Sequence, residues 1–202
     1  MLRLWLIVIT TFLFGSCPSN KKNMDYAQNN IKQYLSVLIQ DSELHGNIGP
    51  KLNENNILEA ESELGIALPQ SFKLFLKEFG NGADWLYHVD QPINGVAKEY
   101  GKIHWLGKYR KHLGETIESN GFGSFKTKTL LCLMTENSNG GAWVFLTSEN
   151  SENGEWPLAF YNMDDQKLYF KVESFTQWIG LAIKCKSEVI RELDEENILN
   201  LG

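Results

Sequence analysis

Apolar residues in the first part of the chain recur at helical spacing. In segment 24–40 they return every three or four positions, which is the spacing of one buried helical face. These residues are Ile31, Tyr34, Leu35 and Leu38. Residues 41–51 carry two glycines and a proline and are expected to form a loop.

The stretch 57–82 predicts two helices joined by a corner. The first helix is expected to end at Gly65, because glycine takes a left-handed conformation without steric cost. Leu68 precedes a proline and should be extended, and Pro69 suits the first position of the second helix. The apolar faces of the two helices are Ile57, Ala60 and Leu64, then Phe72, Phe75, Leu76 and Phe79, before the stop at Gly80-Asn81-Gly82.

From residue 129 the pattern changes to that of β-strands. The apolar runs TLLCLMT, GAWVFLT, PLAFYN and KLYFKV are separated by turn dipeptides at 139–140, 153–154 and 164–165. This spacing predicts antiparallel strands joined by hairpins. GAWVFLT is apolar on both faces, so we expect it at the centre of a sheet covered twice, whereas KLYFKV should lie near an edge.

An earlier strand is expected around Ile103 and Trp105, which share one face, while His104 should point to the opposite side, towards solvent. Residues 108–124 fit either a helix end or a loop. Ser174 is expected to cap a last helix with Phe175, Trp178, Ile179, Ala182 and Ile183 on one face. Together these elements predict an α+β fold with an antiparallel sheet of about four to six strands, N-terminal helices and a closing C-terminal helix.

The corner and the last helix form a specific combination of residues. A helix ends in E-x-E-L-G, x-x-L-P-x-S-F follows, then an aromatic-rich helix and a terminal N-G, and the closing helix carries Phe-x-x-Trp-Ile. The combination resembles the SMI1/KNR4 family of the SUKH superfamily. The matching positions are Glu61, Leu64, Gly65, Leu68, Pro69, Phe72, Phe75, Leu76, Asn81 and Gly82 in the corner, with Phe175, Trp178 and Ile179 in the closing helix.

Most of these positions are apolar or turn residues, so they indicate a fold. Glu61 is expected to have a structural role, accepting a backbone hydrogen bond near the corner. No site for chemistry is visible in the sequence: the four histidines lack a second ligand at metal spacing, and HExxH, CxxC and G-x-S-x-G are absent. We therefore expect no enzyme, cofactor or metal. A hydrolase with paired carboxylates is kept as a third alternative.

Composition narrows the class of partner. The 202 residues suit one domain with a short extension, and the net charge of −6 with a pI of about 5.3 argues against direct nucleic-acid binding. An acidic surface serves solubility, and it also suits a basic partner. The resemblance implies a non-catalytic immunity protein that neutralises a bacterial toxin, such as a nuclease or deaminase. A scaffold or regulatory module without a toxin is the alternative.

Two loops supply candidate partner contacts, because tryptophan and tyrosine are favoured at interfaces. The alternative for each tryptophan is partial burial in the core. The candidates are Asp84, Trp85, Tyr87 and Asp90 after the corner, and Glu152, Glu155 and Trp156 around a turn.

Residues 1–17 have the pattern of a targeting segment. Arg3 precedes an apolar run at 4–14, and Gly15 and Ser16 precede Cys17, an arrangement that resembles a bacterial lipobox. We expect a signal segment at 1–17 with a lipidated Cys17, a polar tether at 18–23 and one domain at 24–202, in a protein anchored at the cell envelope. The alternatives are an ordinary signal, an uncleaved anchor, or a cytoplasmic protein whose translation starts at Met24.

Two further cysteines, Cys132 and Cys185, are expected to be small buried hydrophobic residues. A disulfide between them is the alternative, which two cysteines without framework spacing support only weakly.

Overall fold

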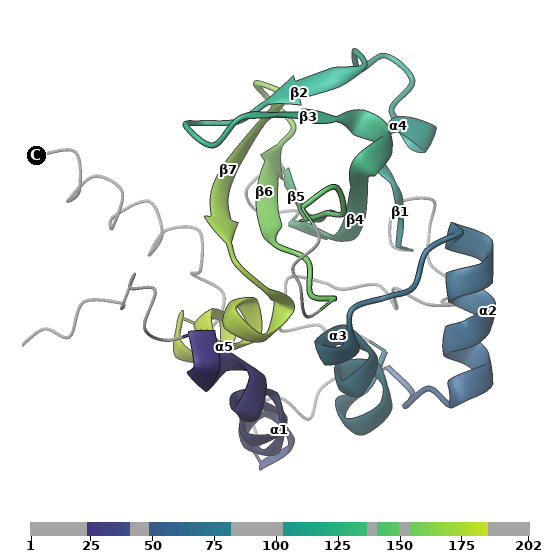
Figure 1. Cartoon of the computed structure of the whole chain (residues 1–202), viewed down its shortest axis with the longest axis vertical. Helices are drawn as coiled ribbons and strands as arrows, with labels where there is room; N and C mark the ends of the chain where they lie inside the picture. Colours follow the sequence, from purple (N-terminus) through teal and green to yellow (C-terminus); the bar gives the residue numbers. More distant parts are fainter. Residues whose placement is uncertain (1–23, 41–48, 82–102, 137–140, 150–153, 186–202) are drawn as a thin grey trace, which may run out of the picture.

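The computed structural model describes residues 24–40, 49–81, 103–136, 141–149 and 154–185. Its centre is a five-stranded antiparallel sheet with strand order β1-β4-β5-β6-β7 (Figure 1). The strands are β1 (His104–Trp105), β4 (Leu130–Glu136), β5 (Gly141–Leu146), β6 (Leu158–Asn162) and β7 (Lys167–Val172). The α+β class and the strand number agree with the sequence-based expectation.

The central strand β5 is buried at every position, as its apolar sequence predicted. Because side chains alternate across a pleated sheet, Trp143 and Phe145 enter one apolar cluster, while Val144 and Leu146 enter the other. β7 lies at the edge, also as predicted. Its pairing with β6 is interrupted by a register shift, and Phe170 there has a φ of 53°.

Helices cover one face of the sheet (Figure 1). Phe72 lies at the centre of this layer, with its ring centroid 5.6 Å from that of Phe145 and 5.0 Å from that of Phe175. Burying an aromatic side chain of this size stabilises a fold by about 1.5–3 kcal/mol. The helices are α1 (Met24–Gln40), α2 (Glu54–Leu64), α3 (Gln70–Leu74), the π-helix η3 (Phe75–Phe79) and α5 (Phe175–Cys185). The predicted cap of α5 is confirmed, because the Gln177 N–H donates to Ser174 Oγ at 3.2 Å.

A hairpin and a short helix cover the other face. Ile117 and Phe125 of the hairpin and Leu106 of the helix are buried against the sheet. Asn120 at the hairpin turn donates its N–H to the Leu168 carbonyl at 2.8 Å, which ties the hairpin to β7. These elements are α4 (Leu106–Tyr109), β2 (Thr116–Glu118), β3 (Ser124–Lys126) and the 3₁₀ turn η4 (Thr127–Thr129). Residues 108–124 therefore include the end of α4 and loop residues, as the two expectations allowed, and also the strand β2, which neither expectation contained.

The second layer also corrects the expectation for His104. Its side chain is only 9% exposed instead of facing solvent. His104 lies opposite Cys132 in the β1–β4 register, so it shares the sheet face that the hairpin layer covers. Trp105 lies on the other face, as predicted, and packs against the helical cluster.

We predict that Gly141→Ala strongly destabilises the domain. A Cβ there would lie 2.1 Å from the Phe160 ring and 2.5 Å from the Tyr161 carbonyl oxygen, so the sheet backbone must move. We expect the free energy of unfolding, measured by urea denaturation, to fall by about 1–3 kcal/mol. Gly114→Ala is the matched control, because its nearest contact would be at 3.8 Å. An equal loss in both variants would contradict the prediction.

Candidate functional site

The corner between α2 and α3 has the geometry that its glycine predicts. Gly65 adopts a left-handed conformation with φ 71° and ψ 23°, and its N–H donates to the Glu61 carbonyl at 2.9 Å. Pro69 differs by one position from the prediction. Its ψ of 143° is not helical, so it caps α3 from outside, and its carbonyl accepts the Lys73 N–H at 3.0 Å.

The carboxylate of Glu61 holds the corner together. Its Oε1 accepts the Leu68 N–H at 2.7 Å and lies 3.1 Å from Lys73 Nζ. This confirms the expected hydrogen bond to the backbone, and it adds an ion pair between the two helices. The indole N–H of Trp105 donates to the Leu64 carbonyl at 3.2 Å, which connects the end of α2 to β1.

The aromatic helix after the corner changes its winding. The apolar spacing of this helix predicts a single helical segment. In the structure α3 passes into the π-helix η3, and the Gly80 N–H donates to the Phe75 carbonyl at 3.1 Å. Phe72 and Phe75 are buried in the core. Asn81 is buried as well, and its N–H donates to the Pro50 carbonyl at 3.0 Å.

The connection between β5 and β6 lies next to this corner. Glu155 accepts the Ser71 N–H at 3.0 Å and also the Ser71 hydroxyl, so it caps the start of α3 from another part of the chain. Trp156 is only 3% exposed, and its ring centroid lies 5.6 Å from that of Phe145. Both residues were candidate partner contacts, and both make internal contacts here.

The other candidate residues lie outside the described part of the chain. They are Cys17, Gly82, Asp84, Trp85, Tyr87, Asp90 and Glu152.

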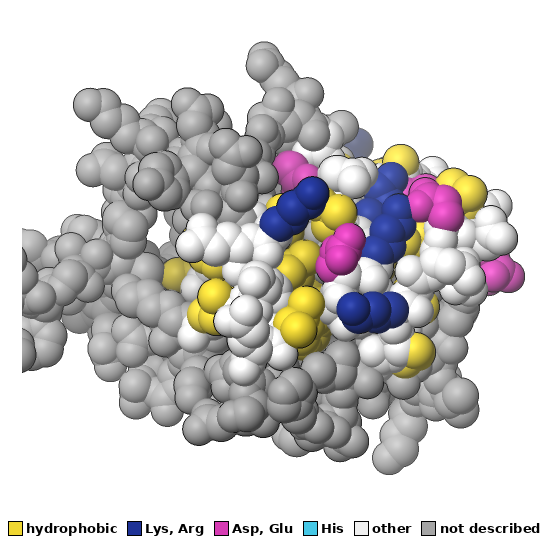
Figure 2. All heavy atoms as spheres, turned by 90° about the horizontal axis from the view of Figure 1, so that it is seen from below, with side chains coloured by type: hydrophobic (Ala, Val, Ile, Leu, Met, Phe, Trp, Pro, Cys, Tyr) yellow, Lys and Arg dark blue, Asp and Glu magenta, His cyan; other side chains and the backbone are white. Residues whose placement is uncertain are grey.

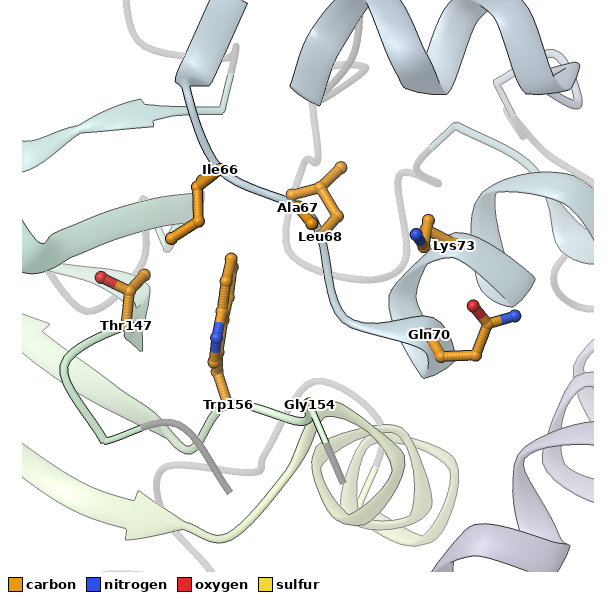
Figure 3. A pocket seen from close by; sticks show the side chains of 8 residues that line it. All are labelled: Ile66, Ala67, Leu68, Gln70, Lys73, Thr147, Gly154 and Trp156. Atoms are coloured by element: carbon orange, nitrogen blue, oxygen red, sulfur yellow. The ribbon is translucent and has the colours of Figure 1, made fainter. Parts of the chain in front are cut away.

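An open pocket of about 360 Å³ lies where the corner meets the β5–β6 connection (Figure 3). In this view Trp156 stands between the extended corner and Thr147. The lining residues are Ile66, Ala67, Leu68, Gln70, Lys73, Thr147, Gly154 and Trp156. Apart from Trp156 and the corner residue Leu68, none was a candidate, because the two segments meet only through the fold.

The charged side chains at the pocket and next to it are engaged within the domain. Lys73 is paired with Glu61, and both oxygens of Glu155 are bound to Ser71. In the part of the chain that the structure describes, no group of three or more metal-ligating side chains is found. Cys132 is a free, buried thiol as expected, and its burial raises its pKa to about 12, with Arg110 opposing this shift. Its thiolate is therefore scarce at neutral pH.

A comparison with protein-family models identifies the family of this chain. A family model described as SMI1-KNR4 cell-wall matches residues 54–179, from the start of α2 into α5. The chain belongs to the SMI1-KNR4 cell-wall family. SMI1-KNR4 domains are protein-interaction modules and generally non-catalytic.

A search of curated proteins finds no match to this SMI1-KNR4 chain. Among its described helices, none combines the length and the apolar character needed to cross a membrane.

We predict that Glu61→Ala costs about 1–3 kcal/mol of unfolding free energy, because it leaves the Leu68 N–H without its acceptor. Glu61→Gln keeps an oxygen for this N–H and loses only the ion pair, so it should cost less, within about 1 kcal/mol. Urea denaturation of both variants measures the difference. Equal losses would show that the ion pair, and not the backbone hydrogen bond, is the main contribution.

We further predict that Cys132 does not react with iodoacetamide in the folded protein at about pH 8, because thiolate is the reactive form. Peptide mass spectrometry separates its labelling from that of the other cysteines. Denaturation in urea is the control and should make Cys132 reactive. Similar labelling rates before and after denaturation would contradict its burial in the SMI1-KNR4 fold.

Proposed function

We propose that this protein is an immunity protein that binds and neutralises a toxin of a bacterial polymorphic or contact-dependent system. The observation that carries the proposal is membership of a family of protein-interaction domains. The SUKH superfamily includes immunity proteins. The pocket at the corner, with its charges already paired inside the domain, supports binding over catalysis.

The charge distribution supports a basic toxin domain, such as a nuclease or deaminase, as the partner. Between Glu54 and Phe79 the chain has five carboxylates and two lysines, so this part contributes half of the net charge of −6. Acidic and basic side chains lie next to each other over α2 and the α3–η3 helix (Figure 2). The support for a basic partner is the net negative charge of this part and not the mixed pattern, because opposite net charge accelerates association.

A second candidate function is a membrane-tethered scaffold or regulatory module. The apolar run at 4–14 followed by Cys17 favours it, because this order is that of a lipoprotein signal. Intact mass of the native protein tests the tether: a lipid on Cys17 supports it, and a product beginning at Met24 contradicts it. The two functions are compatible if the toxin is met at the cell envelope.

We predict that co-expression of this protein with the toxin encoded beside its gene restores growth, and that the two purified proteins form a stable complex. Calorimetry gives the affinity, and growth curves give the protection. No protection together with no complex would contradict the immunity proposal. Protection without a direct complex would mean that another component neutralises the toxin. It would also contradict the proposal that this protein binds the toxin directly.

Charge reversal provides a sharper form of the same experiment. Asp84→Lys, Asp90→Lys and Glu152→Lys in one variant should weaken toxin binding and reduce its dependence on salt, because fewer complementary charges remain. Glu118→Lys, on the exposed side of β2, is the matched control. Unchanged affinity in the triple variant would exclude these loops as the contact surface.

A further inference from the structure

We infer that a surface of four exposed lysines on the hairpin side of the sheet binds a short acidic segment of a protein. The residues of this lysine surface are Lys108, Lys111, Lys126 and Lys128. It lies on the other side of the sheet from α1, α3 and α5, because α4 and the β2–β3 hairpin cover the opposite face (Figure 1). The inference goes beyond the proposed function, since a surface of this charge repels a basic toxin.

The fold gathers the four lysines around Thr127. A Cβ at Gly107 would lie 3.1 Å from Thr127 Oγ1, and the Thr127 N–H donates to the Glu115 carbonyl at 2.9 Å. The segment 107–115 therefore begins and ends beside Thr127. This segment carries the first two lysines of the surface, and the other two flank Thr127 in the sequence. Thr127 itself is buried, while both of its neighbours are exposed.

The lysine surface lacks the counter-charges that lysines of the helical layer have. Lys73 and Lys77 each form an ion pair with a glutamate of α2. No carboxylate of the described residues lies within ion-pair distance of Lys111, Lys126 or Lys128. Positive charges gathered in this way repel one another, and carboxylates of a partner would remove this repulsion.

The small extent of the positive area decides between the classes of acidic partner. Residues 103–129 contain five of the 19 lysines and arginines of the chain, but only two of its 25 acidic residues, Glu115 and Glu118. Their charge is thus +3, and because the whole chain carries −6, the remainder carries −9. A long nucleic acid or an anionic membrane would extend over this acidic remainder and be repelled. A short acidic segment of a protein contacts the lysines alone.

Arg110 marks one border of the lysine surface. Its Cζ atom lies 6.0 Å from the centroid of the Tyr161 ring, and its guanidinium contacts the sulfur of Met163. Asp164 and Asp165 follow Met163 directly in the chain, so acidic side chains begin on that side. The segment is therefore expected to lie over α4, β3 and η4 and not over the turn between β6 and β7.

Peptide display on the native protein tests the lysine surface. Random peptides of about ten residues are selected on the native protein after depletion on Lys126→Glu/Lys128→Glu, which reverses half of the surface. The selected peptides should be rich in aspartate and glutamate, bind this variant at least about tenfold more weakly, and bind less tightly as salt rises. Lys32→Glu/Lys51→Glu is the matched control, because it makes the same charge change at two exposed lysines of the helical side, and its binding should be unchanged.

The inference is overturned if no such peptides are obtained, if they are not acidic, or if the control variant loses as much binding as the reversed surface. A single-stranded oligonucleotide of the same charge and vesicles containing phosphatidylglycerol provide the comparison with other anions. If either binds the native protein more tightly than the selected peptides and requires Lys126 and Lys128, the surface recognises that anion and the inference is wrong.

Discussion

The hydrogen bond from the Leu68 N–H to the Glu61 carboxylate is the contact on which the arrangement of the helices depends. Leu68 is 3% exposed, so water has little access to its backbone, and an unpaired N–H there would cost about 1–3 kcal/mol. The bond sets the direction in which the chain leaves α2. The following helix then places Phe72 between Phe145 of the central strand and Phe175 of α5.

The same corner also borders the pocket. The N–H groups of Ile66 and Leu68 both donate to Glu61, and the segment between them lines the pocket together with residues of the β5–β6 connection. Glu155 reaches back from that connection to Ser71 and holds the two segments next to each other. Leu68 and Lys73, which contact Glu61 in the corner, thereby also line the pocket.

Much of the fold could be predicted from local patterns. The central position of β5, the edge position of β7, the left-handed Gly65 and the cap by Ser174 each follow from a few neighbouring residues. The short strands β2 and β3 could not be predicted, because three residues are too few for alternation to be distinguished from a loop. The burial of His104 was missed for the same reason: the layer that covers it is this hairpin.

The amino-acid sequence by itself determined the class of fold, the order of its elements and the family, since these depend on periodicity and on turn residues that act over a few positions. Only the tertiary structure decided that Glu155 caps α3, that Trp156 packs in the core and that the corner borders a pocket. The segments that meet there are more than seventy residues apart in the chain. Their contact depends on how the sheet and helices pack, and no local pattern records it.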